Sequence, residues 1–222
     1  MNYFKFEKGV HDFPFYNNNP PLSNKSWNIL CIILILSILY TIITHKVLPT
    51  IITSSLILIY LLWSSNWNYK IVLHKPTSEE IIFLIVLIII KVSFVCWIIT
   101  ISNYTSFVSS VPLISFGNLI SFAWDALIDD VILFIVMLLS MKLIYQYSKN
   151  RKSAIILSSI ITIGIYGTLY LSLNLNILSI FLVLYRYLGF TFDIFAYIKT
   201  KNLAICFLLH YVSRILLFMM LI

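Results

Sequence analysis

The chain has 222 residues, of which 61% are hydrophobic and 10% are charged, and its formal net charge is +7. A water-soluble domain is excluded, because so few polar side chains cannot cover a soluble surface. Nucleic-acid binding is also disfavoured, because the basic residues lie in short breaks between long apolar segments, as in membrane proteins. We therefore predict an all-α polytopic transmembrane helical bundle of about seven spans in the cell membrane.

The N-terminal third of the sequence is expected to form a surface tail and three spans. Residues 1–26 are polar and are expected to form a cytoplasmic or interfacial tail, and they do not have the pattern of a cleavable signal peptide. The region 27–101 then holds three apolar segments, expected at about 27–44, 47–63 and 81–101. The first two segments are separated by a tight turn around His45 and Pro49.

Two features of the third segment carry specific expectations. Thr77-Ser78-Glu79-Glu80 precedes the apolar run and has the pattern of a capping box at a helix start. Lys91 lies in the middle of the run. A lysine at membrane depth must face protein or water, or pair with a carboxylate.

Residues 111–147 are too long for one ordinary span. As a helix they would extend about 55 Å, almost two bilayer cores. They form either two spans, or one span preceded by an interfacial or re-entrant piece around Pro112 and Gly117. The positive-inside bias favours one main span at about 119–145, because this leaves only Lys46 outside. Three more spans follow, at about 154–172, 177–198 and 203–222, with the N-terminus cytoplasmic.

Ionisable residues inside the apolar segments form a buried polar set. They are Lys91, Asp125, Asp129, Asp130, Arg186, Asp193, His210 and Arg214. Asp125 and Asp129 share one helix face, and His210 and Arg214 share another, so we infer that the fourth-span acids face the seventh-span bases. Two interpretations stay open: a carboxylate that activates water with the help of a histidine, or a charge-paired core that holds the bundle together.

The region 112–222 resembles the CPBP family of intramembrane proteases, which includes the CAAX prenyl proteases and bacteriocin-processing proteins. The family pattern has Glu-Glu-x-x-x-Arg in one span, Phe-x-x-x-His in the next, and a His-x-x-x-Asn-like motif in the last. In this chain Asp129-Asp130-Val-Ile-Leu-Phe134 lies where the paired glutamates are expected, and His210 matches the last motif. The run from Tyr187 to His210 is similar to the last third of the family.

The motif positions are largely substituted. Phe134 stands at the arginine position, and Arg214 stands at the Asn-like position. No histidine occurs between Ala154 and Ile198; alignment and depth favour Tyr166 there, with Thr162 at the Phe position. Tyr170 and Asn174 are alternative alignments. Glu79-Glu80 superficially resembles the first motif, but it lies too early in the chain and its capping role explains it.

The resemblance implies an endopeptidase that acts on a peptide or bacteriocin-like substrate in the lipid bilayer, in bacteriocin processing or self-immunity. Asp129 or Asp130 would be the general base, His210 would support the water or the oxyanion, and Tyr166 and Arg214 would occupy the other motif positions. Because only His210 is identical, catalysis itself stays open. The alternatives are a non-catalytic immunity or binding protein and a transporter subunit. The residues specify no cofactor or metal.

Overall fold

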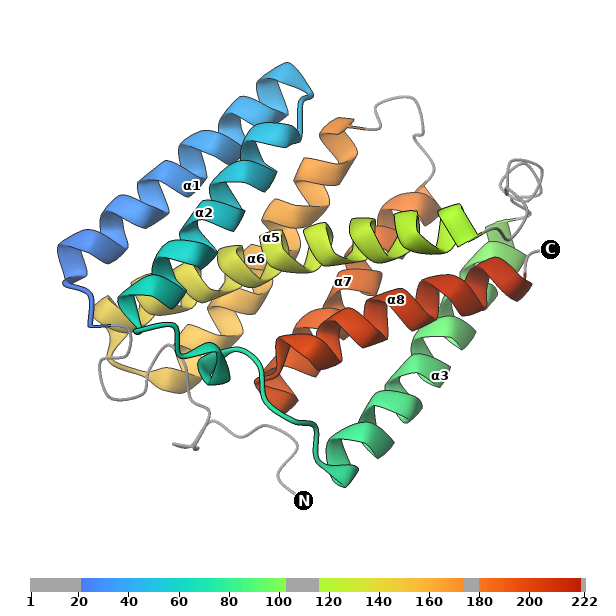
Figure 1. The fold of residues 1–222 in the computed structure, drawn as a ribbon. Helices are drawn as coiled ribbons and strands as arrows, with labels where there is room; N and C mark the ends of the chain where they lie inside the picture. The colour runs from blue at the N-terminus through green and yellow to red at the C-terminus, as the bar shows by residue number, and fades with distance from the viewer. Residues whose placement is uncertain (1–20, 103–115, 174–179, 221–222) are drawn as a thin grey trace.

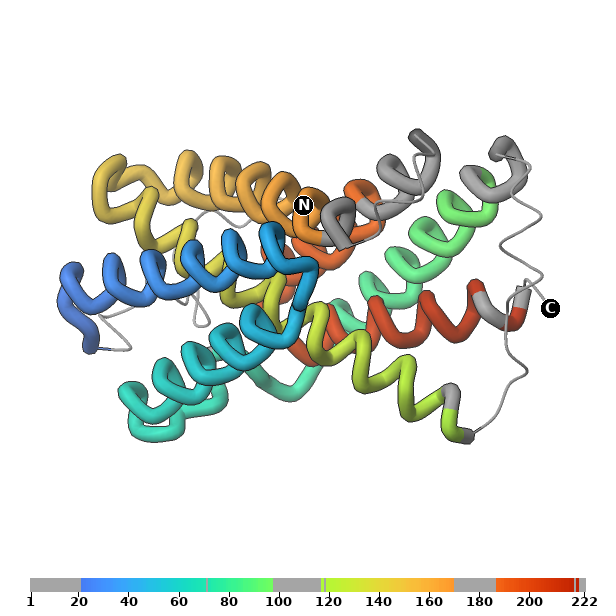
Figure 2. Tube along the Cα trace, turned by 90° about the horizontal axis from the view of Figure 1, so that it is seen from above, coloured from blue at the N-terminus to red at the C-terminus, as the bar shows by residue number. Residues whose placement is uncertain are grey.

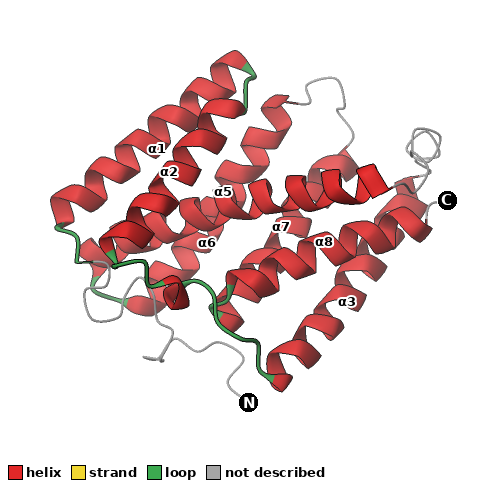
Figure 3. Cartoon of the chain, in the orientation of Figure 1, coloured by secondary structure: helices red, strands yellow, loops and turns green. Residues whose placement is uncertain are grey.

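The computed structural model describes residues 21–102, 116–173 and 180–220. All regular structure in these ranges is helical, as predicted (Figure 3). The α-helices are α1 (Asn24–Thr44), α2 (Leu48–Ser64), α3 (Ser78–Ser102), α5 (Phe116–Ser148), α6 (Arg151–Leu173), α7 (Ile180–Thr200) and α8 (Leu203–Met220), with a short 3₁₀ helix, η1 (Tyr69–Ile71). The expected tail up to residue 20 and the stretch around Pro112 lie outside the described residues.

Helix ends coincide with local stop and start signals in the sequence. The Ser23 side chain caps α1 by accepting from the Ser26 N–H at 3.1 Å, and α1 ends at His45 in the left-handed conformation. Pro49 then occupies the first turn of α2, where its missing N–H does no harm. The capping box of α3 is confirmed: Glu80 accepts from the Thr77 N–H at 2.9 Å, and Thr77 accepts from the Glu80 N–H at 3.3 Å.

Within the described residues, three helices are long and apolar enough to cross a membrane: Asn24–Thr44, Ser78–Trp97 within α3, and Arg151–Leu169 within α6. The apolar helices Leu48–Ser64 and Leu203–Leu217 are shorter. Large apolar side chains on α1 and α3 point outward; for example, Ile43 is 76% exposed and Ile82 is 63% exposed. Such continuous exposed apolar faces fit hydrocarbon and not water, so the molecule is a membrane protein.

The helix α5 is the centre of the bundle. It contacts α1, α2, α6, α7 and α8, whereas α3 packs against α7 and α8. Figures 1 and 2 place α1 and α2 at one end of the bundle and α3 and α8 at the other, with α5 running through both. The close approach of α6 to α7 depends on Gly167, because a Cβ there would overlap the Tyr187 ring. The chain therefore has two packing regions that share α5: the first includes α1 and α2, and the second includes α3, α7 and α8.

The sequence left open whether residues 111–147 form one span or two. From residue 116 onward this segment belongs to one continuous helix, which ends at residue 148. Its 33 residues correspond to about 50 Å, longer than a bilayer core of about 30 Å. The C-terminal half of α5 packs on α1, where the Cys31 thiol lies 3.8 Å from the Leu139 carbonyl oxygen and the Lys142 ammonium lies 5.3 Å from the Trp27 ring centroid. The N-terminal half faces α8 and carries the aspartates.

Candidate functional site

Four ionisable side chains from four helices meet inside the second region, and we call them the ionic cluster. Lys91 comes from α3, Asp130 from α5, Asp193 from α7 and His210 from α8. Their side chains are 8%, 2%, 1% and 14% exposed, in that order. Placing one charge at mid-bilayer costs about 2.5–3.5 kcal/mol on insertion scales, so a cluster of this kind persists only if the charges neutralise one another or serve a function.

Lys91 and Asp193 form the closest ion pair of the cluster. The Lys91 ammonium donates to Asp193 Oδ1 at 2.7 Å, and both side chains are buried. Burial strengthens the attraction because there is little water to screen it, but the same burial makes either partner costly alone. The pair therefore ties α3 to α7 and fixes the position of the Asp193 carboxylate.

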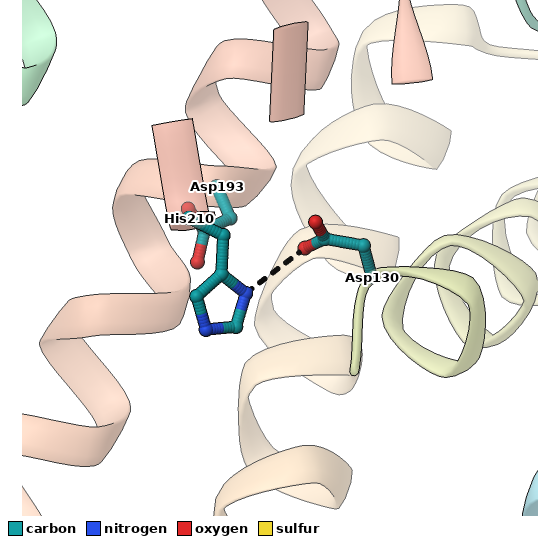
Figure 4. Close-up of side chains that lie close together, drawn as sticks. All are labelled: Asp130, Asp193 and His210. Carbon is teal, nitrogen blue, oxygen red and sulfur yellow. Dashed lines mark hydrogen bonds and ion pairs between the residues drawn. The ribbon is translucent and has the colours of Figure 1, made fainter. Parts of the chain in front are cut away.

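Asp130 and His210 form the second pair, drawn in Figure 4. Nδ1 of His210 lies 3.3 Å from Asp130 Oδ1, so the carboxylate orients the imidazole ring. The other carboxylate oxygen, Oδ2, is buried and accepts no hydrogen bond from any described residue. A buried carboxylate oxygen is strongly favoured to accept hydrogen bonds. Oδ2 is therefore the atom of the cluster best suited to take a proton from a water or a substrate group.

The two pairs lie close enough to act as one site. One ligand atom from each of Asp130, Asp193 and His210 lies within 4.8 Å of the others. Two carboxylates and one ammonium give the cluster a formal charge of −1 when His210 is neutral. A proton on His210 would make the cluster neutral, whereas a divalent metal ion would leave it positive and would share the Asp193 carboxylate with Lys91. The donor set suits a metal ion, but its charge balance suits a proton better.

A more exposed polar pair continues the site along α5 and α8. Arg214 Nη2 lies 3.7 Å from Asp125 Oδ2, and these side chains are 35% and 49% exposed. The Arg214 guanidinium also lies 5.5 Å from the centroid of the Phe122 ring. Polar side chains thus lead from the more exposed pair to the buried Asp130–His210 pair. This arrangement confirms for Asp125 the expectation that the fourth-span acids face the His210 and Arg214 face of the last helix, and it adds Asp130 as the partner of His210.

The remaining sequence candidates are placed as follows. Asp129 is half-buried and does not belong to the group of three close ligand atoms. Tyr166 is fully buried on α6, and its ring packs edge-to-face against Phe190 of α7 at 4.2 Å between centroids. Asn174 lies outside the described residues, and the structure does not describe the side chains of Tyr170 and Arg186. Of the motif positions, the structure therefore joins Asp130 to His210.

Two residues of the cluster, Lys91 and Asp193, were not among the predicted site residues. The sequence did show both as charges inside apolar segments and required a partner for Lys91, but it offered several carboxylates. Phe134, at the expected arginine position, instead packs edge-to-face on Tyr197 at 5.1 Å between ring centroids. The carboxylate thus takes its cationic neighbours from α3 and α8.

Glu79 and Glu80, the early glutamate pair, lie in the first turn of α3, where Glu80 has a structural role. Glu80 closes the capping box of α3 and lies 3.2 Å from His74 Nε2.

No family model, curated protein or solved structure matches the chain, so the proposal for its function depends on the geometry of the ionic cluster.

Proposed function

We propose that the chain is a multi-pass membrane protein of seven spans with a CPBP-like core over residues 112–222, and that it hydrolyses a peptide at the membrane. The observation that carries the proposal is the buried Asp130–His210 pair, in which one oxygen of Asp130 holds the imidazole and the other has no partner among the described residues. These two residues occupy the first and last motif positions of the resemblance, and a carboxylate with a histidine is a recurrent arrangement for activating water.

The distribution of basic residues supports the proposed orientation. The Leu203 N–H donates to the Val72 carbonyl at 2.9 Å, so the connection from α2 to α3 and the turn from α7 to α8 lie at the same end of the bundle. That end carries Lys70, Lys75, Lys199 and Lys201. The positive-inside rule assigns this end to the cytoplasm, which also places the N-terminus there.

The proposed reaction uses the residues of the cluster in defined roles. Oδ2 of Asp130 removes a proton from a water molecule, and the water oxygen attacks the carbonyl carbon of the scissile peptide bond. His210 stabilises the negative charge that develops on the carbonyl oxygen. The proton then passes to the leaving nitrogen as the C–N bond breaks, which yields a carboxylic acid and an amine. Lys91 and Asp193 are positioning residues, because they anchor the helix behind the imidazole.

A cleavage assay tests this proposal. The full chain is reconstituted in vesicles and incubated in ¹⁸O-labelled water with a panel of synthetic bacteriocin peptides, and mass spectrometry then detects fragments whose new C-terminus carries ¹⁸O. We expect Asp130→Asn to reduce the rate at least about 10²-fold, because general-base catalysis contributes about 10²–10⁴-fold. Asp129→Asn is the matched control, since it makes the same change one residue away and should retain activity.

Two outcomes would contradict the proposal. Undiminished cleavage by Asp130→Asn would remove Asp130 from the reaction. Absence of cleavage by the wild type, together with binding of a bacteriocin that persists in Asp130→Asn, would instead identify a non-catalytic binding protein.

A further inference from the structure

The first packing region has a polar end, where the start of α1 meets the end of α5 (Figure 1). The two helices pack in opposite directions. Cys31 on α1 contacts Leu139 on α5, and one turn nearer this end the Lys142 ammonium lies 5.3 Å from the centroid of the Trp27 ring. Gln146 follows Lys142 by one more turn, so it shares the same face of α5. The contact between the two helices therefore continues from apolar side chains into polar ones.

Two donor groups at this end are buried and have no acceptor among the described residues. They are the indole Nε1 of Trp27 and the amide Nε2 of Gln146. Trp27 is only 1% exposed, so its N–H does not reach water as that of an interfacial tryptophan usually does. The side-chain oxygen of Asn28, the residue after Trp27, is also buried without a described partner. Buried polar groups are nearly always hydrogen-bonded, so this end has bonding capacity that the described residues do not use.

The Lys142 ammonium adds a positive charge beside these donors. Its side chain is partly buried, and the ion pairs among the described residues do not include it. Its position over the Trp27 ring stabilises the charge but leaves the N–H groups of the ammonium available. The exposed Lys25 and Lys149, at the same helix ends, add to the positive potential. Together, the charge and the unused N–H groups favour an anion with several oxygen atoms.

We propose that Trp27, Lys142 and Gln146 form a binding site for the phosphate group of an anionic phospholipid. The indole and amide N–H groups suit phosphate oxygens, and the ammonium contributes the point charge. Trp27 lies in the first turn of α1 and Lys142 within the last two turns of α5, so both are within about 10 Å of the helix ends, near the depth of lipid headgroups. Free phosphate has the same chemistry.

The site is separate from the ionic cluster and does not depend on the proposed hydrolysis. Lys142 lies more than three turns after Asp130 on α5, which is about 18 Å along the helix axis. The proposed orientation places the site at the cytoplasmic surface, where anionic lipids are recognised by basic sites between helices. A bound phosphate would link α1 to α5, so the lipid should also stabilise the first packing region.

Native mass spectrometry of the full chain in detergent tests the site. The protein is titrated in one arm with phosphatidylglycerol, with phosphatidylcholine for comparison, and in the other arm with inorganic phosphate. Lys142→Gln removes the charge, Lys142→Arg retains it, and Trp27→Phe removes the indole N–H but keeps an aromatic ring. Lys25→Gln is the matched control, because Lys25 is an exposed lysine at the start of the same helix. A thermal melt checks the folding of each variant, and Lys142→Gln decides the test if Trp27→Phe is unfolded.

A second measurement follows the Trp27 N–H directly. The protein is labelled with ¹⁵N in the tryptophan indole groups, and the resonance that is lost in Trp27→Phe is assigned to Trp27. We expect this resonance to shift on addition of phosphatidylglycerol and not of phosphatidylcholine, because a new acceptor changes the environment of the N–H.

We expect one phosphatidylglycerol per chain to bind in preference to phosphatidylcholine. Lys142→Gln and Trp27→Phe should each weaken this at least about tenfold, the effect of losing one charge-assisted hydrogen bond. Lys142→Arg and Lys25→Gln should bind within about twofold of the wild type. Binding of inorganic phosphate with the same dependence on Lys142, and no preference between the two lipids, would identify free phosphate as the source. Equal binding by Lys142→Gln and the wild type, or equal losses in Lys142→Gln and Lys25→Gln, would overturn the site.

Discussion

The two packing regions that share α5 bury polar groups in different ways. Between α1 and α2, a hydroxyl cluster of Ser37, Thr41 and Thr50 is uncharged: Thr41 and Thr50 hydroxyl oxygens lie 2.7 Å apart, and the Thr50 hydroxyl donates to the Ser37 carbonyl at 3.2 Å. Between α3, α5, α7 and α8, the ionic cluster is charged and leaves one carboxylate oxygen without a partner among the described residues.

The separation of the partners in the sequence also differs between the two clusters. The hydroxyl partners are 9 or 13 residues apart on one helical hairpin, whereas the pairs of the ionic cluster are 80 and 102 residues apart. Hydrogen bonds between membrane helices contribute about 0.6 kcal/mol each on average, so hydroxyl groups are sufficient to join two helices. Four helices do not need buried charges to pack. The comparison supports a structural role for the hydroxyl cluster, and it motivates the proposal that the ionic cluster is kept for its chemistry.

Breaking the Lys91–Asp193 pair should have the largest effect on stability. Lys91→Met leaves the Asp193 carboxylate buried and unpaired, and we expect a loss of about 3–5 kcal/mol in the free energy of unfolding. Thermal unfolding of the detergent-purified protein measures the change. The double variant Lys91→Met/Asp193→Leu should recover most of the loss, because it removes both charges. A single variant as stable as the wild type would show that the pair does not hold α3 to α7.

The hydroxyl cluster should respond to a substitution with a smaller loss. Thr50→Val keeps the shape of the side chain and removes its hydrogen bonds to Ser37 and Thr41, so we expect a loss of about 1–2 kcal/mol. Thr44→Val is the matched control on the same hairpin, because its hydroxyl donates to the Tyr40 carbonyl one turn earlier in its own helix. The same thermal measurement applies. Equal effects of the two substitutions would mean that the interhelical hydroxyl bonds contribute nothing specific.

Breaking the more exposed Asp125–Arg214 pair should have the smallest effect on stability. Asp125→Asn is expected to change the free energy of unfolding by less than about 1 kcal/mol, because the Asp125–Arg214 pair is partly solvated and 3.7 Å apart. Chemical denaturation at low and high salt measures the contribution. A loss as large as that of Lys91→Met would place Asp125 within the ionic cluster and remove the distinction between the exposed and buried pairs.

The helices followed from sequence patterns because apolar runs and their caps are local. The expected segment 27–44 corresponds to Asn24–Thr44, and the last segment begins at residue 203 in both. The helix α5 extends beyond the expected 119–145 because polar residues at its ends, such as Asn118 and Gln146, still continue the helix. Helix periodicity indicated that Asp125 faces the last helix, where it pairs with Arg214, whereas it placed Asp129 and not Asp130 on the same face.

The composition of the site was harder to predict. The choice between Asp129 and Asp130 depends on the rotation of α5 about its axis, since neighbouring residues differ by about 100° in direction. The partner of Lys91 depends on how α3 crosses α7, and the apolar surfaces that set this crossing carry no unique pattern. Asp193 was therefore recognisable as a buried charge but not as a member of the site.

A survival assay that compares one residue from each cluster in a living cell decides whether the ionic cluster is chemical or structural. A bacteriocin-sensitive host expresses the wild type, Asp130→Asn or Thr50→Val at matched membrane levels, and survival is scored against a panel of bacteriocins. We expect Asp130→Asn to lose protection while it remains folded in the membrane, and Thr50→Val to protect as well as the wild type. Full protection by Asp130→Asn would contradict the claim that the ionic cluster is kept for chemistry, and would leave both clusters with the same structural role.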